Sequence, residues 1–167
     1  MILNTKITKF IPSLQYNQST IITPVKYLLS NLNFLKKHIT YSLTSLQTII
    51  GIDFINSKAR FGIVYQLYSY TNKQHINVKV FFPLKKKIPS VVSIFLSANW
   101  FEREIWDMFG IFFKNHPDLR RILTDYTFEG HPLRKDFPLV GFFETNFLEQ
   151  KGGLVLQQLS LAQKPKF

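Results

Sequence analysis

Two stretches with apolar residues at every second position restrict the fold of this 167-residue chain more than any other feature. The alternating positions are Phe61, Ile63, Tyr65, Leu67, Ile76, Val78, Val80 and Phe82. Because alternate side chains of a strand share one face, each stretch predicts a strand with one buried face. A short polar turn at residues 71–74 separates them, so together they predict an antiparallel hairpin.

Weaker patterns predict further elements around this hairpin. Residues 20–23 and 46–52 are rich in β-branched side chains and predict two more strands. Residues 25–38 predict a helix, because the leucines at positions 28, 32 and 35 share one helical face after a proline. Residues 88–95 and 99–109 also have helical patterns. The predicted fold class is α/β or α+β, with a small mixed or antiparallel sheet and helices on one side.

The chain has the length of one domain followed by a tail. We expect an N-terminal arm at 1–18, disordered or docked on a partner, and an α/β domain at 19–112. Residues 113–167 predict an extended, Pro-punctuated docking region and tail. Within that tail, residues 147–160 flank a Gly-Gly turn and predict a second hairpin.

Charge and composition limit the possible functions. The net charge is +11, and the first 100 residues hold 12 Lys or Arg against a single acid, Asp53. Such a basic half suits RNA, anionic lipid headgroups or acidic protein surfaces. The chain has no cysteine, which excludes a thiolate nucleophile, cysteine-ligated iron-sulfur clusters and cysteine-type zinc sites. No apolar run approaches the roughly 20 residues that a membrane-spanning helix requires.

The sharpest basic cluster is the run Lys85–Lys87. It is typical of a contact with an anion or an acidic partner. It is more typical of a solvated loop whose charges prevent a sheet edge from pairing with another chain.

Residues 99–110 predict a helix with its own start and stop signals. Asn99 is expected as the N-cap, with Glu102 bonding back to it, and Gly110 as the terminator. Phe101, Ile105, Met108 and Phe109 fall on one face and predict core packing, while Arg103 and Asp107 lie together on the other. Trp106 beside this charged face is typical of an interface anchor.

We considered and set aside a catalytic or metal-binding role for the polar residues of this half. Glu102 and Glu104 point to different sides of the predicted helix, and no nucleophile lies near them. His116, Asp125, Glu129 and His131 lie in a Pro-punctuated segment, where no helix is expected to align metal ligands at i, i+4 spacing. We therefore predict no catalytic residue, no metal site and no cofactor-binding residue.

The second half of the chain resembles a known family, the 30-kDa subunit of respiratory complex I, equivalent to the bacterial C subunit. The matching segments are Ser97–Trp100, Glu102–Glu104, Trp106–Gly110, His116–Leu123 and Gly130–Leu139. Their length and order make the resemblance specific, although the upstream residues match loosely. The tail departs from the family pattern, because residues 144–167 are short, Gln-rich and basic.

The resemblance implies a structural subunit of the peripheral arm of the proton-pumping NADH:ubiquinone oxidoreductase, without catalytic residues of its own. It would bind the 49-kDa-type quinone-site subunit and neighbouring iron-sulfur subunits, without nucleic acid, and reach the membrane only through the complex. The expected location is the matrix side of the mitochondrial inner membrane, or the cytoplasmic side in a bacterium. The implied partner-facing residues are Glu102, Arg103, Trp106, Asp107, Arg120, Arg121, His131, Arg134, Lys135 and Asp136.

The main alternative is a basic RNA-binding or ribosomal protein of an organelle, suggested by the charge and the aromatic strands. The strands lack the Gly-Phe-Gly-Phe type of run typical of RNA-recognition sheets, and the most specific segment is charge-balanced. A free-standing enzyme is the third possibility, but the sequence has no phosphate-cradling glycine loop and no nucleophile with a base.

Overall fold

The computed structural model describes residues 18–148 and 152–160. The predicted N-terminal arm, residues 1–18, therefore lies outside the described residues except for its last one. The described part combines a four-stranded sheet, two short two-stranded pairings and two α-helices, which confirms the predicted α+β fold.

The four-stranded sheet has the strand order β1-β4-β3-β2. Its strands are β1 (Gln18–Ile22), β2 (Ser45–Asp53), β3 (Phe61–Ser69) and β4 (Gln74–Phe82). The predicted hairpin is confirmed, because β3 and β4 pair antiparallel from Phe61 opposite Phe82 to Ser69 opposite Gln74. β2 also pairs antiparallel with β3, whereas β1 runs parallel to β4, so the sheet is mixed.

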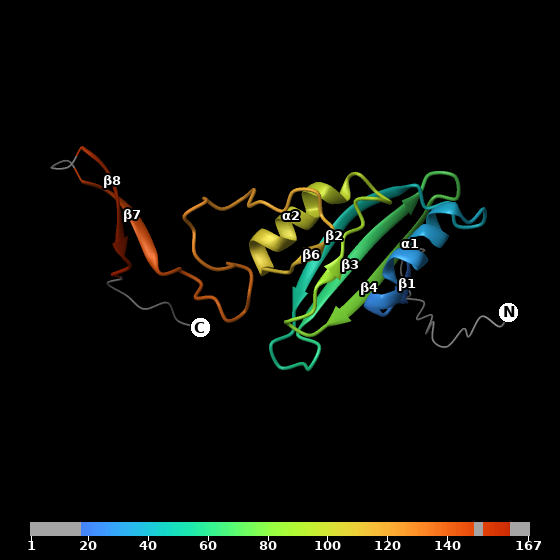
Figure 1. Ribbon diagram of the computed structural model, residues 1–167, viewed down its shortest axis with the longest axis horizontal. Coiled ribbons are helices and arrows are strands. Elements are labelled where there is room, and N and C mark those ends of the chain that lie inside the picture. The colour runs from blue at the N-terminus through green and yellow to red at the C-terminus, as the bar shows by residue number, and fades with distance from the viewer. Residues whose placement is uncertain (1–17, 149–151, 161–167) are drawn as a thin grey trace.

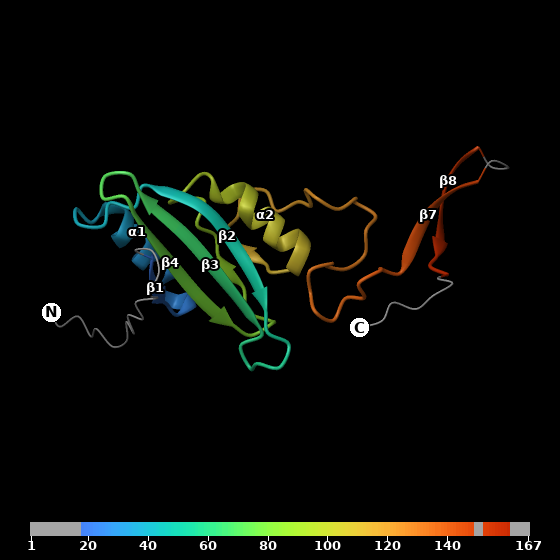
Figure 2. The same cartoon turned by 180° about the vertical axis from the view of Figure 1, so that it is seen from behind.

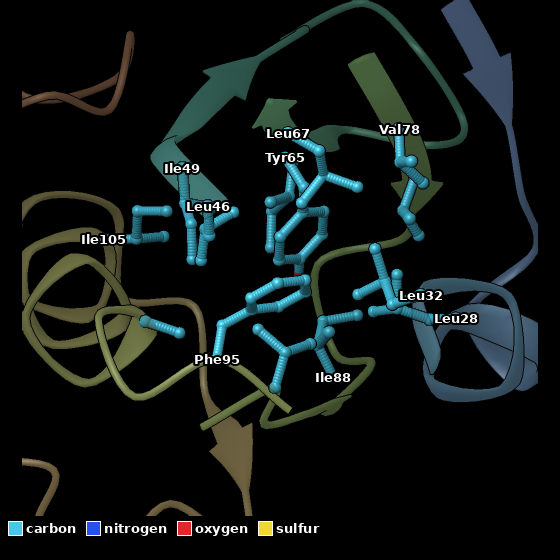
Figure 3. Packing of buried hydrophobic residues seen from close by; sticks show 14 of the residues in the cluster. Leu28, Leu32, Leu46, Ile49, Tyr65, Leu67, Val78, Ile88, Phe95 and Ile105 are labelled. Atoms are coloured by element: carbon cyan, nitrogen blue, oxygen red, sulfur yellow. The ribbon is translucent and has the colours of Figure 1, made fainter. Parts of the chain in front are cut away.

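Both α-helices cover the same face of this sheet (Figures 1 and 2). A 3-10 turn, η1 (Val25–Tyr27), leads into α1 (Leu28–Lys37), which buries the three predicted leucines. The second helix, α2 (Ala98–Phe109), packs along β2 and buries Ile105. Figure 3 shows the resulting core, in which Tyr65 and Phe95 lie between side chains of both helices. Burying each large apolar side chain contributes roughly 1.5–3 kcal/mol, so this face defines the domain.

Residues 88–95 are not helical, which corrects the sequence prediction. Ile88–Pro89 forms the short strand β5, which pairs in parallel with β6 (Phe113–Lys114), and turns follow it. Pro89 disfavours the helical conformation at Ile88, the residue before it. The Glu102 carboxylate accepts a hydrogen bond from the backbone N–H of Val91 at 2.7 Å, and this long-range bond holds the segment in its irregular conformation.

The ends of α2 agree with the prediction at one terminus only. The helix begins at Ala98 after Ser97, and no side chain caps it, so the Asn99 N-cap and the return bond from Glu102 were wrong. Glu102 is instead buried and bonded to the segment after β5. Gly110 ends the helix in the left-handed conformation, with φ of 69°, as predicted.

After β6 the chain runs without regular structure as far as residue 142. It then forms the predicted second hairpin, β7 (Phe143–Leu148) with β8 (Gly153–Gln158), which begins four residues earlier than expected. In both views this hairpin stands apart from the sheet and the helices (Figures 1 and 2).

Candidate docking interface

Asp107 fixes residues 121–124, in the irregular stretch after β6, to the helix α2. Its side chain is completely buried, and its carboxylate accepts three backbone N–H bonds from residues 122–124 at 2.9–3.2 Å. The Arg121 guanidinium and the Thr124 hydroxyl donate two further bonds, at 2.8 and 2.5 Å. Burial would raise the pKa of Asp107, but the hydrogen bonds from Thr124 and its neighbours outweigh it and hold the pKa at about 2. An ionised carboxylate therefore organises this turn.

The carboxyl end of α2 is satisfied by a later part of the same segment. Backbone carbonyls at a helix end have no partners within the helix. His131 Nδ1 contacts the Asp107 carbonyl at 2.9 Å, and Arg134 Nε donates to the Phe109 carbonyl at 2.5 Å. The Leu133 N–H donates to the Met108 carbonyl at 3.1 Å. Residues 131–134 thus act as the cap of α2.

Gly110 is required at this cap for two reasons. Its φ of 69° is a conformation that residues with a side chain rarely adopt. A Cβ there would also collide with Arg134 Nη2 and with His131 Nε2. The glycine lets both side chains approach the helix end.

Asp53 provides a second attachment, at the end of β2. The buried carboxylate accepts two bonds from Arg60, at 2.9 and 3.0 Å, and one from the Lys135 N–H at 3.0 Å. The bond from Arg60 is the largest influence and lowers the pKa of Asp53. Arg60 also pairs with Asp136 at 2.9 Å. The sheet and residues 135–136 are therefore joined through one ion cluster.

Arg103 supports the segment from the exposed side of α2. Its guanidinium donates to the carbonyls of Arg120 and Arg121, at 3.2 and 3.5 Å. It also lies over the ring of Trp100, with 5.9 Å between its Cζ and the ring centroid. Arg120 itself is exposed and paired with Asp118 at 2.7 Å. This side of the helix thus carries cations and an aromatic ring at the surface.

The residues that make these contacts all lie within the range that one sequence-family model matches. A family model described as "Respiratory-chain NADH dehydrogenase, 30 Kd subunit" matches residues 21–143. The chain belongs to this family. It is 43% identical to NADH-ubiquinone oxidoreductase subunit 9 of Reclinomonas americana, over 93% of this chain and 78% of the relative. It is 45% identical to the C subunit of the NADH-quinone oxidoreductase of Brucella ovis, over 91% and 75% of the two chains.

A solved structure shares the fold of this 30-kDa-family chain. It is the membrane-bound sulfane sulfur reductase, an archaeal respiratory membrane complex, which matches with a TM-score of 0.67. The match covers 77% of this chain and 76% of the other, at 23% identity, and so establishes the fold alone. The alternative of an RNA-binding or ribosomal protein is not supported, because the family match and the relatives are NADH:quinone oxidoreductase subunits.

Glu102, the first acid of the run Glu102–Glu104, is buried within this chain. Its carboxylate accepts bonds from the Ser90 hydroxyl at 2.6 Å and the Val91 N–H at 2.7 Å. Burial raises the pKa of Glu102 to about 7, although both hydrogen bonds act in the opposite direction. The Nε2 atom of His116 lies 3.9 Å from the carboxylate. Glu102 thus holds the segment after β5 against α2.

The ten residues predicted to face a partner have different environments in this family member. Glu102 and Asp107 are buried in the chain, so their role is to position other segments. Arg103, Arg121, His131 and Arg134 bond to backbone carbonyls, and Trp106 contacts Arg121 and His131 through its ring. Arg120, Lys135 and Asp136 are exposed. Which of them contact a partner stays a prediction.

Sequence reasoning missed Asp53, Arg60 and Thr124 as parts of this interface. Asp53 had a signal in the sequence, since it is the only acid in the first 100 residues and an isolated acid among cations is a candidate for a specific ion pair. Thr124 and Arg60 had none.

The histidine and carboxylate set considered for a metal does not come together in the described part of the chain. No three potential ligands gather among residues 18–148 and 152–160. His116 contacts the Asn99 carbonyl and the Asp118 N–H, while His131 caps α2. No helix in these same ranges is both long and apolar enough to span a bilayer.

Proposed function

We propose that this chain is a structural subunit of the peripheral arm of a proton-pumping NADH:ubiquinone oxidoreductase. It supports electron transfer from NADH to ubiquinone through neighbouring subunits and has no catalytic or redox centre of its own. The family match and the names of the relatives support membership of such a complex. The geometry supports a role in holding subunits together.

The observation that carries the proposal is that residues 118–136, called the docking segment below, are fixed to the domain by buried carboxylates. Asp107 and Asp53 receive N–H bonds from this segment, so its backbone is ordered before any partner arrives. Its outward side chains include Leu123, Tyr126 and Leu133, of which Tyr126 is 80% exposed. Ordering a binding segment in advance reduces the entropy lost on association. This is the arrangement expected of a docking surface.

The β7–β8 hairpin supports the same function. Phe143, Thr145, Phe147, Leu154 and Leu156 share one of its faces, and its four apolar side chains are 60–73% exposed. An isolated two-stranded hairpin is at best marginally stable in water, and a face this apolar needs a cover. Residues 113–167 would then act as the docking region, and residues 19–112 as the domain that carries it.

A small pocket beside the docking segment supports a contact at α2. It has a volume of about 150 Å³ and is lined by residues of β2 and α2 and by Leu133, with Glu104 as its one acidic lining residue. A pocket of this size accepts one apolar side chain of a neighbour.

The partners we propose are the 49-kDa-type quinone-site subunit and the iron-sulfur subunits beside it. The place is the matrix side of the mitochondrial inner membrane, or the cytoplasmic face in a bacterium, with membrane contact only through the complex. This part of the proposal rests on the resemblance and on relatives of both mitochondrial and bacterial type.

The test uses a matched pair of changes in β8. Leu154→Ser together with Leu156→Ser removes apolar side chains from the exposed face, whereas Val155→Ser changes the residue between them, which faces the other way. On a blue-native gel of gently solubilised membranes, we expect the double variant to leave the large band with NADH dehydrogenase activity. We expect the Val155 variant to remain in it.

Because Leu154 and Leu156 are exposed, the double variant keeps the unfolding free energy of the isolated chain within about 1 kcal/mol of the parent. Equal incorporation of all three chains would contradict a docking role for the hairpin. A parent chain that migrates outside the active band would contradict the proposed function as a whole.

A further inference from the structure

The sheet has one face that neither helix covers. In Figure 2 the sheet lies in front and both α-helices lie behind it. The register places Ile50, Val64, Lys79 and Ile22 in one row across this open face, and Ile52, Gly62 and Phe81 in the next. Ile22 and Ile50 remain 46% and 47% exposed, whereas Val64 between them is 9% exposed. The open face is therefore a flat surface with apolar rows and one lysine within it.

A pair of aromatic rings lies at one end of the open face. Phe54 and Phe81 have ring centroids 5.9 Å apart and both rest on Gly62. A Cβ at position 62 would approach the Phe81 ring to 3.1 Å and the Phe54 ring to 3.3 Å, so only glycine lets the rings lie this close to the strand. Ile55 and Leu84, in the loops at the same end, are both more than 45% exposed.

Apart from Asp136, which pairs with Arg60, the exposed charges around this end are positive. Lys58 lies in the loop before β3, and Lys85 and Lys86 lie in the loop after β4, all exposed. No Asp or Glu occurs between residues 54 and 101. Asp53 is buried and bonded to Arg60, so it does not neutralise them. The lysine run therefore lies beside exposed apolar side chains. A loop that is only solvated does not need apolar side chains at its surface.

We propose that the open face, together with Phe54, Phe81, Lys58, Lys85 and Lys86 at one of its ends, binds an acidic segment of another protein whose apolar side chains alternate with carboxylates. Charge complementarity selects the acidic residues, and the exposed Ile and Phe side chains select the apolar ones. This second docking surface adjoins the docking region 113–167, because Arg60 pairs with Asp136 across the boundary.

A protein partner fits this surface better than nucleic acid or lipid. Bases stack on freely presented ring faces, whereas Phe54 and Phe81 pack on each other at 56° and on Gly62. Lipid insertion needs apolar side chains that project beyond the cations, whereas most of these apolar groups lie on a flat sheet. A sheet face between cations matches an amphipathic protein segment.

The inference rests on the proposed function in one respect, which is that the partner is sought in the assembly that contains this chain. The assembly is isolated through a tag on the full-length chain and treated with an amine-acetylating reagent, beside the isolated chain. We expect acetylation of Lys58, Lys85 and Lys86 to fall several-fold in the assembly. Lys37, which is exposed on the helix α1, is the control and should keep its reactivity.

A zero-length carbodiimide cross-linker then identifies the occupant. We expect links from Lys58, Lys85 or Lys86 to Asp or Glu of another protein. Lys85→Glu with Lys86→Glu should abolish the links and reduce recovery of that protein, while Lys37→Glu should not. Both changes are on the surface and leave the core intact.

Full reactivity of the three lysines in the assembly would overturn the inference. So would charge-dependent binding of the isolated full-length chain to phosphatidylglycerol vesicles or to a single-stranded RNA without protein cross-links. An assembly that lacks NADH dehydrogenase activity would instead count against the proposed function, and the lysine protection would still test the surface.

Discussion

At the scale of single residues, two buried carboxylates in α2 have opposite responses to pH. Hydrogen bonds lower the pKa of Asp107 to about 2, so its contribution to stability is present above its ordinary value of 3.8 and is lost as the pH falls through 2. Burial raises the pKa of Glu102 from 4.5 to about 7. Its contribution is therefore complete below pH 4.5 and is lost as the pH rises through about 7.

Glu102→Gln tests the second of these effects. Glutamine cannot ionise, and its one carbonyl oxygen can still accept from the Val91 N–H while its NH2 group can donate to the Ser90 hydroxyl oxygen. We expect the parent chain to lose stability, on the order of 3 kcal/mol, between pH 4.5 and 8, and the variant to lose much less. The measurement is the unfolding free energy from chemical denaturation at several pH values across this range. Glu104→Gln, on the same helix, should leave the parent slope unchanged, and an unchanged slope in Glu102→Gln would refute the assignment.

At the scale of elements, the C-terminal cap of α2 is the contact on which the docking segment depends. Gly110 and Gly141 both have positive φ, of 69° and 82°. A Cβ at Gly110 would collide with Arg134 and His131, whereas a Cβ at Gly141 meets nothing within 4 Å. The two positions thus share the backbone cost of an alanine and differ only in the clash.

Gly110→Ala is therefore expected to lower the unfolding free energy more than Gly141→Ala. The backbone cost is roughly 1 kcal/mol in each. The additional loss of unfolding free energy in Gly110→Ala measures the displacement of Arg134 and His131. The Leu133 N–H donates to the Met108 carbonyl, and its hydrogen exchange should become faster only in that variant. Equal losses in both variants would show that the cap does not depend on the close approach.

The elements also show what the sequence could predict. The β3–β4 hairpin and α1 follow from local periodicity, because each buries a face whose spacing is visible in a few residues. The helix predicted at residues 88–95 was wrong because a short apolar run does not distinguish strand from helix. The bond that decides the conformation comes from Glu102, 11 residues after Val91. Local patterns contain no trace of such a partner.

For the candidate interface too, the sequence predicts some features and not others. Its location in residues 99–136 follows from the resemblance, and Gly110 follows from cap chemistry. Whether a charged residue points outward does not follow. Asp107 has the sequence signature of a surface acid on an amphipathic helix, yet its donors lie 14 to 17 residues further along the chain. Only the folded chain separates the buried anchors from the exposed contacts.

At the scale of the whole molecule, acids and bases have different tasks. The basic first half has one acid, Asp53, and this residue is buried where β2 ends. Its partners are Arg60 from the same half and the Lys135 N–H from the docking segment, 82 residues away. This one carboxylate thus joins the sheet directly to the docking segment, through Arg60 and the Lys135 N–H.

Asp53→Asn tests whether this connection prepares the chain for assembly. The amide loses the charge that pairs with Arg60 but keeps an acceptor, so the fold should persist with a moderate loss of stability, about 2–3 kcal/mol. Residues 134–136 should exchange their amide protons faster, and incorporation into the active band on a blue-native gel should fall. Asp118→Asn, which alters an exposed pair with Arg120, should leave the amide exchange of residues 134–136 unchanged. If Asp53→Asn loosens the segment and the chain still assembles like the parent, then the partner itself orders the segment, and the buried carboxylates serve stability alone.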